Sequence, residues 1–205
     1  MASLKELRNR IASVKATQKI TKAMQMVAAA KLRLAQDQAQ NARPYAQRMA
    51  AVIANLAAGV SGAGAPRLLV GTGEDRNHLV VVATSDRGLA GGFNAQVIRR
   101  ALALQREAVG AGQEVVWFST GRKAASTLRF RRLKVIQSWT GFSERPAYRD
   151  AQVLAHAVSE AFVNGEVDRV VVVYNAFISA LTQRVTVREL LPISQELIRH
   201  AVEAE

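Results

Sequence analysis

The sequence predicts an α/β protein in which a long N-terminal helix precedes a mostly parallel α/β domain. Residues 3–58 contain no glycine and a single proline, whereas residues 59–77 contain five glycines. Beyond them, short apolar runs alternate with helical patterns, which is typical of a parallel sheet. We therefore expect a helix over 1–58, a linker over 59–77, an α/β domain over 78–192, and the start or a fragment of another helix over 193–205.

The first helix begins with a capping box, Ser3-x-x-Glu6, in which each side chain can bond the backbone N–H of the other residue. Good helix formers such as Ala, Leu, Gln and Lys dominate the residues that follow. A continuous helix of this length would extend about 80 Å at about 1.5 Å per residue. We expect Pro44 to bend the helix without ending it. The rest of the chain cannot cover so long a helix, which therefore needs another partner.

Apolar side chains line one face of this helix at the three- and four-residue spacing of a coiled coil. The polar residues Thr17, Gln18 and Thr21 interrupt the face, and the apolar positions then resume with a shifted register. This pattern predicts an irregular coiled coil with a partner helix. The apolar stripe consists of Leu4, Leu7, Ile11, Val14, Ile20, Val27 and Leu34.

The charge of the chain is concentrated in the same helix. The net charge is +12 and the pI is about 11.0, and residues 1–48 carry ten bases against two acids. A helix this basic predicts an acidic partner, although a merely solvated face remains open. Because the bases surround an apolar stripe and the first aromatic residue is Tyr45, a protein partner is favoured. A nucleic-acid-binding module is the alternative.

The α/β domain begins with a continuous apolar run that is typical of a strand buried on both faces. Its last strand is expected to pair antiparallel with the strand before it. Residues 194–205 have a helical pattern. The predicted strands cover 78–84, 113–119, 133–137, 167–175 and 184–191, and the predicted helices cover 95–109, 121–128 and 149–164.

A glycine-rich turn, residues 84–94, follows the first of these strands. A strand, a Gly-x-x-Gly-Gly turn and a helix form the place where many α/β proteins bind phosphate. This turn lacks the Lys-Ser/Thr of a P-loop and the spacing of a dinucleotide fingerprint, so we expect a structural turn. A small nucleotide-binding enzyme is our third hypothesis.

The chain offers few groups for catalysis. It has no cysteine, and His78, His156 and His200 fall on different elements without the spacing of metal ligands. No run of 18 apolar residues could span a membrane. We expect no catalytic residue, no metal site, no cofactor and no enzymatic activity of the chain alone.

Several stretches resemble the gamma subunit of F-type ATP synthases. SLKELRNRIASV at 3–14 and TQKITKAMQMVAA at 17–29 are similar to its N-terminal helix, and RPYA at 43–46 to the continuation of that helix. TSDRGLAGGFN at 84–94 is similar to its signature turn. The resemblance extends to about residue 192. The signature-turn residues that carry it are Asp86, Arg87, Gly88, Gly91 and Gly92.

This resemblance implies a rotor shaft that forms half of an antiparallel coiled coil, above a Rossmann-like α/β foot. It implies a non-catalytic subunit whose rotation couples proton flow to ATP synthesis or hydrolysis. The implied partners are the alpha and beta subunits, the epsilon subunit and the membrane ring of c subunits, at the cytoplasmic side of a bacterial inner membrane. The residues implied to contact an acidic loop of beta are Lys19, Lys22 and Met24.

The family also has a second long helix after the α/β domain, and these 205 residues contain no counterpart of its motif. Residues 195–198 resemble at most the end of that helix. We therefore expect a shortened form of a longer chain, in which the apolar stripe lacks its partner within the same chain.

Overall fold

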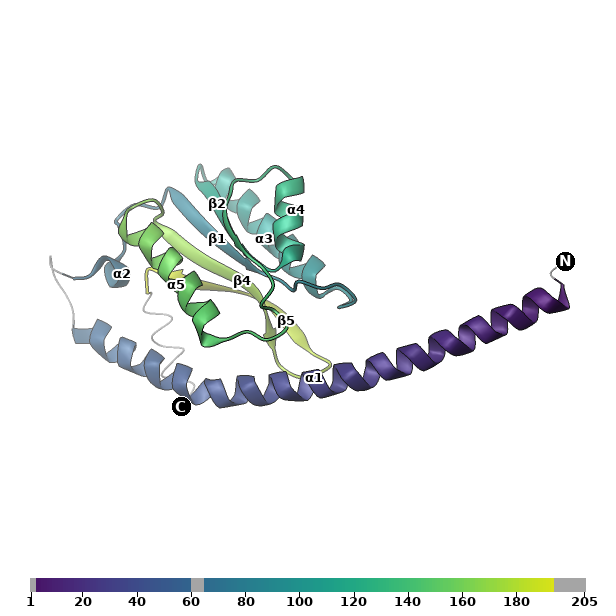
Figure 1. Ribbon diagram of the computed structural model, residues 1–205. Helices are drawn as coiled ribbons and strands as arrows, with labels where there is room; N and C mark the ends of the chain where they lie inside the picture. The colour runs from purple at the N-terminus through teal and green to yellow at the C-terminus, as the bar shows by residue number, and fades with distance from the viewer. Residues whose placement is uncertain (1–2, 60–64, 194–205) are drawn as a thin grey trace. The chain divides into compact units, whose positions relative to one another are not determined.

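A computed structural model describes residues 3–59 and 65–193 of the chain. Contacts within it separate two compact units, the first ending at Ile53 and the second beginning at Ala54. The first unit is a single helix and the second contains a β-sheet with helices on both faces, as Figure 1 shows. This confirms the predicted fold class of a long helix plus an α/β domain.

Helix α1 (Leu4–Gly59) contains 56 residues, which corresponds to about 84 Å at about 1.5 Å per residue. The predicted capping box closes its first turn. The Ser3 N–H donates to Glu6 Oε2 at 2.7 Å, and the Glu6 N–H donates to Ser3 Oγ at 3.3 Å. Pro44 lies inside the helix, which continues beyond it as one curved ribbon.

Four parallel strands and one antiparallel strand form the sheet, in the order β3-β2-β1-β4-β5. The first strand along the chain, β1, lies at the centre, with Leu79 opposite both Val116 and Val170. β5 pairs antiparallel with β4, as predicted. The strands are β1 (Asn77–Ala83), β2 (Glu114–Thr120), β3 (Val135–Trp139), β4 (Arg169–Phe177) and β5 (Gln183–Leu191).

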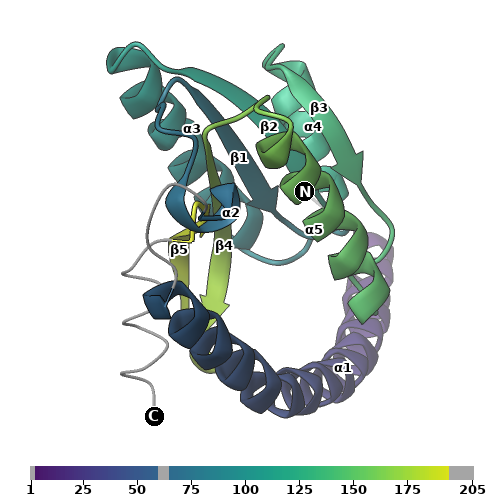
Figure 2. The same cartoon turned by 90° about the vertical axis from the view of Figure 1, so that its left-hand side faces the viewer.

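Helices cover both faces of the sheet (Figures 1 and 2). Because successive side chains of a strand point to opposite faces, Val80 and Val82 pack under α3 and α4 while Leu79 and Val81 pack under α5. Trp117 is fully buried on the α3 side. The helices of this unit are α2 (Arg67–Val70), α3 (Phe93–Gly110), α4 (Arg122–Phe130) and α5 (Tyr148–Val163).

The structure differs from the predicted linker over 59–77. α1 extends to Gly59, and the segment contains the short helix α2. Leu68 packs against the core on the α5 side, and its carbonyl accepts a hydrogen bond from the Ile193 N–H at 2.8 Å. The last part of the expected linker therefore belongs to the α/β unit, because Leu68 packs against the core of that unit. The helix predicted over 194–205 lies outside the described residues.

Candidate functional site

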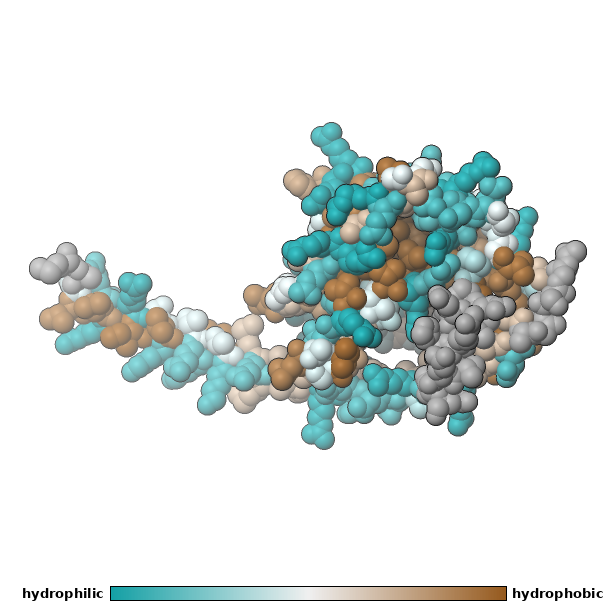
Figure 3. All heavy atoms as spheres, turned by 180° about the vertical axis from the view of Figure 1, so that it is seen from behind, coloured by the Kyte–Doolittle hydropathy of each residue, from teal (hydrophilic) through white to brown (hydrophobic). Residues whose placement is uncertain are grey.

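The apolar stripe of α1 is open to solvent. All seven of its side chains are exposed, from 46% for Leu7 to 76% for Leu4. Figure 3 shows a row of hydrophobic side chains along the N-terminal part of α1, bordered by hydrophilic ones. A row of this length costs free energy when left in water, so this face fits a partner that covers it.

The polar interruption of the stripe satisfies its own hydrogen bonds. The Thr17 hydroxyl donates to the Ser13 carbonyl at 3.1 Å, and the Thr21 hydroxyl donates to the Thr17 carbonyl at 2.9 Å. Each bond reaches back one turn within the helix. The two hydroxyls can therefore face an apolar partner without losing a hydrogen bond. A shallow depression on this side of α1 is lined by Val14, Thr17, Gln18, Thr21, Lys22 and Gln25.

Lys19, Lys22 and Met24 also lie exposed on α1, and Met24 retains 53% of its surface. Lys19 and Lys22 are three residues apart, so they lie on neighbouring positions of the helix surface. Within residues 3–59 and 65–193, neither lysine forms an ion pair. Their charges are therefore available to an acidic partner.

The glycine-rich turn has an internal anion at its centre, the Asp86 carboxylate. Its Oδ1 accepts the Arg122 N–H at 3.1 Å, at the start of α4. Its Oδ2 accepts the Gly141 N–H at 2.9 Å, and both the N–H and the hydroxyl of Ser143, at 3.1 and 2.7 Å. Three backbone N–H groups of the kind that bind a phosphate elsewhere are thus donated to this side chain. This arrangement joins the ends of β1 and β3 to the start of α4.

The same hydrogen bonds set the charge state of Asp86. Burial alone would raise the pKa of its carboxyl group, but the Ser143 hydroxyl and the N–H groups of Gly141, Ser143 and Arg122 hold that pKa below the ordinary value of 3.8. The carboxylate is therefore ionised at neutral pH, and it is the ionised form that the loop binds.

Close backbone packing reinforces this end of the sheet. Gly121 has a φ of +85°, and a Cβ placed on it would lie 2.2 Å from the Thr84 carbonyl oxygen. The Thr84 hydroxyl accepts the Ala124 N–H at 2.9 Å. Only glycine permits this approach of α4 to β1.

The other predicted residues of the turn lie around this centre. Arg87 Nε is 2.6 Å from Glu144 Oε1, which adds an ion pair to the loop after β3. Gly91 adopts a φ of +54°, and Gly92 is the N-cap residue of α3. Gly88 is exposed. In the described structure, the turn therefore connects elements of the unit to one another.

A second carboxylate, Asp168, has a similar role at the opposite end of the sheet. It is buried just before β4, and it accepts the Thr72 hydroxyl at 2.8 Å and the N–H groups of Arg76 and Asn77 at 3.1 and 2.9 Å. Burial would raise the pKa of Asp168, but these three hydrogen bonds, led by the one from Asn77, and the nearby His78 lower it. Asp168 thus fixes the chain that enters β1.

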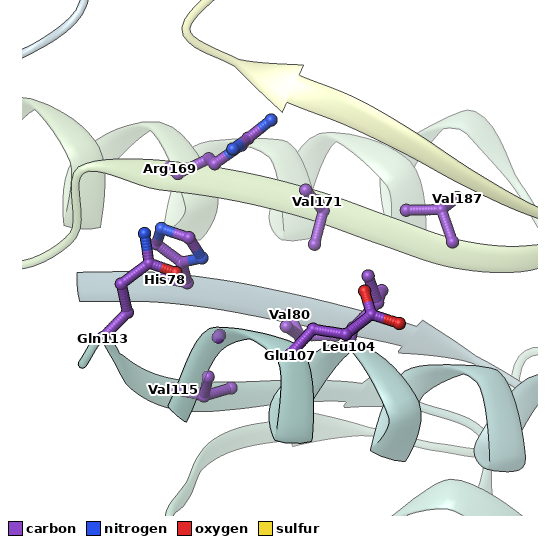
Figure 4. Close-up of a pocket in the computed structure, with 10 residues that line it drawn as sticks. His78, Val80, Leu104, Glu107, Gln113, Val115, Arg169, Val171 and Val187 are labelled. Carbon is purple, nitrogen blue, oxygen red and sulfur yellow. The ribbon is translucent and has the colours of Figure 1, made fainter. Parts of the chain in front are cut away.

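A pocket of about 340 Å³ opens beside the first residues of β1, β2 and β4 (Figure 4). Most of its polar groups are already paired: His78 Nε2 lies 2.6 Å from Asp75 Oδ1, and Arg169 Nη2 donates to Glu189 at 2.8 Å, whereas Arg169 Nε is buried without a hydrogen-bond partner among the described residues. Valine and leucine side chains form most of the remaining lining. No nucleophile with an adjacent base lies here, so the pocket does not favour the hypothesis of a small nucleotide-binding enzyme.

Two further features of the described residues bear on the class of protein. No group of three or more His, Cys, Asp or Glu side chains there could hold a metal ion. No helix in residues 3–59 and 65–193 is both long and apolar enough to cross a membrane.

Sequence reasoning missed the partners of both carboxylates. Ser143 and Glu144 fall between the strand predicted over 133–137 and the helix predicted over 149–164, and Asp168 falls inside the strand predicted over 167–175 with no role assigned to it. One signal was present: β1, β2 and β3 are parallel, so their carboxyl ends share one edge of the sheet, where residues 84–94, 121 and 140–144 must meet. The periodicity of the strands does not reveal which donors face Asp86.

The sequence and structure have clear counterparts among known proteins. A family model described as ATP synthase matches residues 3–205. An ATP synthase gamma chain of Phenylobacterium zucineum is 59% identical over 196 residues, covering 94% of this chain and 66% of the relative. A gamma chain of Caulobacter sp. strain K31 is 51% identical, with the same two coverages. The chain thus spans 66% of the length of these two relatives.

Solved structures give the same picture. A chain in the central stalk and c-ring of the Tetrahymena thermophila mitochondrial ATP synthase matches with a TM-score of 0.64 and 27% identity, over 88% of this chain and 77% of that one. A chain from the rotor of the Euglena gracilis enzyme matches with a TM-score of 0.55 over 96% and 65%. Its identity is 18%, so it supports the fold alone.

Proposed function

We propose that this chain, which belongs to the ATP synthase family, is a rotor subunit of the central stalk of an F-type ATP synthase. In this role it has no active site of its own. Its rotation couples proton flow through the membrane ring to ATP synthesis or hydrolysis on the alpha and beta subunits. The observation that carries the proposal is the 56-residue helix with an exposed apolar stripe and a strongly basic surface.

The physical properties of α1 suit a shaft. A continuous helix resists bending because each turn is hydrogen-bonded to the next. We propose that its apolar stripe packs against a second, antiparallel helix, which would bury the side chains now in water and stiffen the pair. The internally bonded Thr17 and Thr21 permit close packing where the register of the stripe shifts.

The basic residues suit a surrounding acidic head. Lys19, Lys22 and Met24 are proposed to contact an acidic loop of the beta subunit. Lysines on a solvated helix attract carboxylates over roughly 10 Å at moderate salt, and the polarizable, flexible Met24 can slide against changing neighbours. Each such ion pair is weak, because both partners are exposed to solvent. Weak contacts suit a rotor surface that must leave one subunit and meet the next.

The α/β unit is proposed to be the foot of the rotor, with the epsilon subunit and the c-ring as its partners. Support comes from the Tetrahymena match, which belongs to a central stalk and c-ring assembly. A peripheral position at the cytoplasmic side of a bacterial inner membrane, held there by the complex, is part of the same proposal; the two relatives named above are bacterial gamma chains. The hydrogen bonds to Asp86 within the glycine-rich turn would help to keep such a foot rigid.

Co-purification tests this function. The chain is expressed with tagged alpha and beta subunits of Caulobacter, and the complex is captured at low and high salt. We expect capture that weakens with salt, and an affinity about 2- to 30-fold lower for the Lys19→Gln/Lys22→Gln variant, on the basis of about 0.2–1 kcal/mol per exposed ion pair. The matched control is Arg43→Gln/Arg48→Gln, which removes the same charge from the same helix.

Three results would contradict the proposal. They are the absence of capture at low salt, ATPase activity of the isolated chain, and an equal loss of affinity in the two double variants. The alternative of a nucleic-acid-binding module instead predicts binding to random DNA that falls steeply with salt. No observation on the described residues favours that alternative.

A further inference from the structure

A basic patch with an exposed aromatic residue lies at the end of α4, far along the sequence from the basic helix. Residues 115–143 contain six bases and no acid. Four of these bases lie within four residues of Phe130 in the sequence, and the Phe130 side chain is 88% exposed. We name this group the Phe130 patch, and it consists of Arg129, Phe130, Arg131, Arg132 and Lys134.

None of these four bases is neutralised within the described residues. Each is exposed, and each lacks an ion pair there. The patch follows the buried side of α4, where Ala124, Ala125 and Leu128 contact the sheet, and it precedes the edge strand β3. A rigid element therefore presents four uncompensated charges and one large apolar group on a single turn.

The backbone conformation of this turn suggests that Arg132 is present for a reason other than folding. α4 ends in a Schellman motif, in which the Leu133 N–H donates to the Leu128 carbonyl at 3.1 Å. The left-handed position of that motif, with a φ of +57°, is occupied by Arg132. Glycine is the usual residue there because a side chain is strained in this conformation. An arginine held at a strained position points to a role outside folding.

We propose that the Phe130 patch docks on an anionic lipid surface. Clusters of four or more Lys and Arg residues bind acidic headgroups, and a protruding aromatic ring can enter the boundary between headgroups and acyl chains. An acidic protein is a poorer fit, because a stable protein interface needs about 800 Å² per partner around an apolar centre, and this turn exposes one aromatic side chain. Single-stranded nucleic acid is also a poorer fit, because proteins bind it in a groove where successive bases stack on several aromatic side chains, and this turn exposes one. The proposal does not depend on the rotor function.

Because α1 is also basic, the test must report on this turn and not on total binding. In the full chain, Phe130→Trp places a fluorescent probe in the patch, and Leu181→Trp places one at another exposed position. Because Trp117 and Trp139 also fluoresce, the signal of each variant is its difference from the parent chain under the same conditions. Each protein is mixed with vesicles of phosphatidylcholine containing about one third phosphatidylglycerol, with brominated acyl chains as quenchers. We expect a blue shift and quenching at residue 130 that are absent at residue 181 and absent with phosphatidylcholine alone.

Charge variants in the Phe130→Trp background complete the test. Arg129→Gln/Arg131→Gln/Lys134→Gln should abolish the quenching at residue 130, since each base near an anionic surface contributes about fivefold in affinity. The matched control is Arg99→Gln/Arg106→Gln/Arg149→Gln, three exposed bases of the same unit, which should leave the quenching intact. Arg132→Gly should weaken quenching about fivefold while raising the folding equilibrium constant about two- to fivefold.

The proposal is overturned if residue 130 is quenched no more than residue 181, or if the two triple variants lose quenching equally. It is also overturned if the emission at residue 130 shifts with poly-glutamate or oligo-dT but not with the anionic vesicles. Those two results would assign the patch to an acidic protein or to nucleic acid.

Discussion

The replacement of Asp86 by Ala tests whether the glycine-rich turn holds the α/β unit together. Alanine removes the acceptor of three backbone N–H groups and one hydroxyl. Hydrogen bonds to an ionised group contribute about 1.5–3 kcal/mol each when buried, but Asp86 is partly exposed and the four bonds are not additive. We therefore expect Asp86→Ala to lower the free energy of unfolding by about 2–4 kcal/mol.

Asp86→Asn is the finer perturbation. Its amide keeps one oxygen, which can serve the three donors at the Oδ2 position, while its NH₂ group faces the Arg122 N–H. The expected loss is about 1–2 kcal/mol, about half that of Asp86→Ala. Glu166→Gln is the matched control, because Glu166 is an exposed carboxylate without a side-chain hydrogen bond in the described structure.

Urea unfolding followed by tryptophan fluorescence measures these losses, since both tryptophans, the buried Trp117 and the half-buried Trp139, lie in the α/β unit. The midpoint should fall by about 1–2 M for Asp86→Ala, at an unchanged slope. The pH dependence adds a second check. The folded-state pKa of Asp86 is depressed, so its contribution is complete above the unfolded value of about 3.8 and is lost as pH falls through the folded pKa. A variant with the midpoint of Glu166→Gln, or a loss that persists in full at low pH, would refute the reasoning.

The remaining predictions concern other parts of the α/β unit. Gly121→Ala should unfold the unit or destabilise it by at least about 3 kcal/mol, because the new Cβ would strike the Thr84 carbonyl. The control Gly112→Ala, at a similar φ but with open space around it, should cost only about 1 kcal/mol. Equal losses in thermal unfolding would contradict the close approach. Thr72→Val should lower the free energy of unfolding by about 1 kcal/mol, because it removes one hydrogen bond to Asp168. Hydrogen exchange at the Arg76 and Asn77 amides should then speed up, and unchanged exchange would argue against Asp168 as the group that holds them. Leu89→Gly should stabilise the unit by up to about 1 kcal/mol, because Leu89 is 97% exposed at a φ of +59°, and a lower melting temperature would show that its side chain has a structural role.

The fold was predictable because its strongest signals are local. The side chains of the apolar run in β1 enter two cores, one on each face of the sheet, as expected of a strand buried on both faces. The capping box fixed the start of α1. The bounds of β3 were less clear: it begins two residues later than predicted, at Val135, because the Schellman turn after α4 takes up Leu133. Because Arg132 stands where glycine usually ends a helix, this turn has no glycine to mark it in the sequence.

The candidate site was less predictable than the fold. The exposed stripe and the bases of α1 follow from spacing and composition, so the sequence alone predicts them, and their contacts with partners stay a prediction. The donors to Asp86 come from positions 36 to 57 residues away, and no local pattern indicates them. Arg132 has an unremarkable sequence context, and only its left-handed backbone distinguishes it from the neighbouring bases.

Single-molecule observation of rotation tests the central claim most directly. The chain has no cysteine, so one cysteine at the exposed Ser126 gives a unique attachment point for a bead on the α/β unit. The labelled chain is assembled with immobilised alpha and beta subunits of a bacterial relative, and ATP is added. A rotor predicts that the bead turns in one direction and stops when ATP is removed. An assembled complex that hydrolyses ATP while the bead stays still, or moves without a preferred direction, would contradict the rotor function.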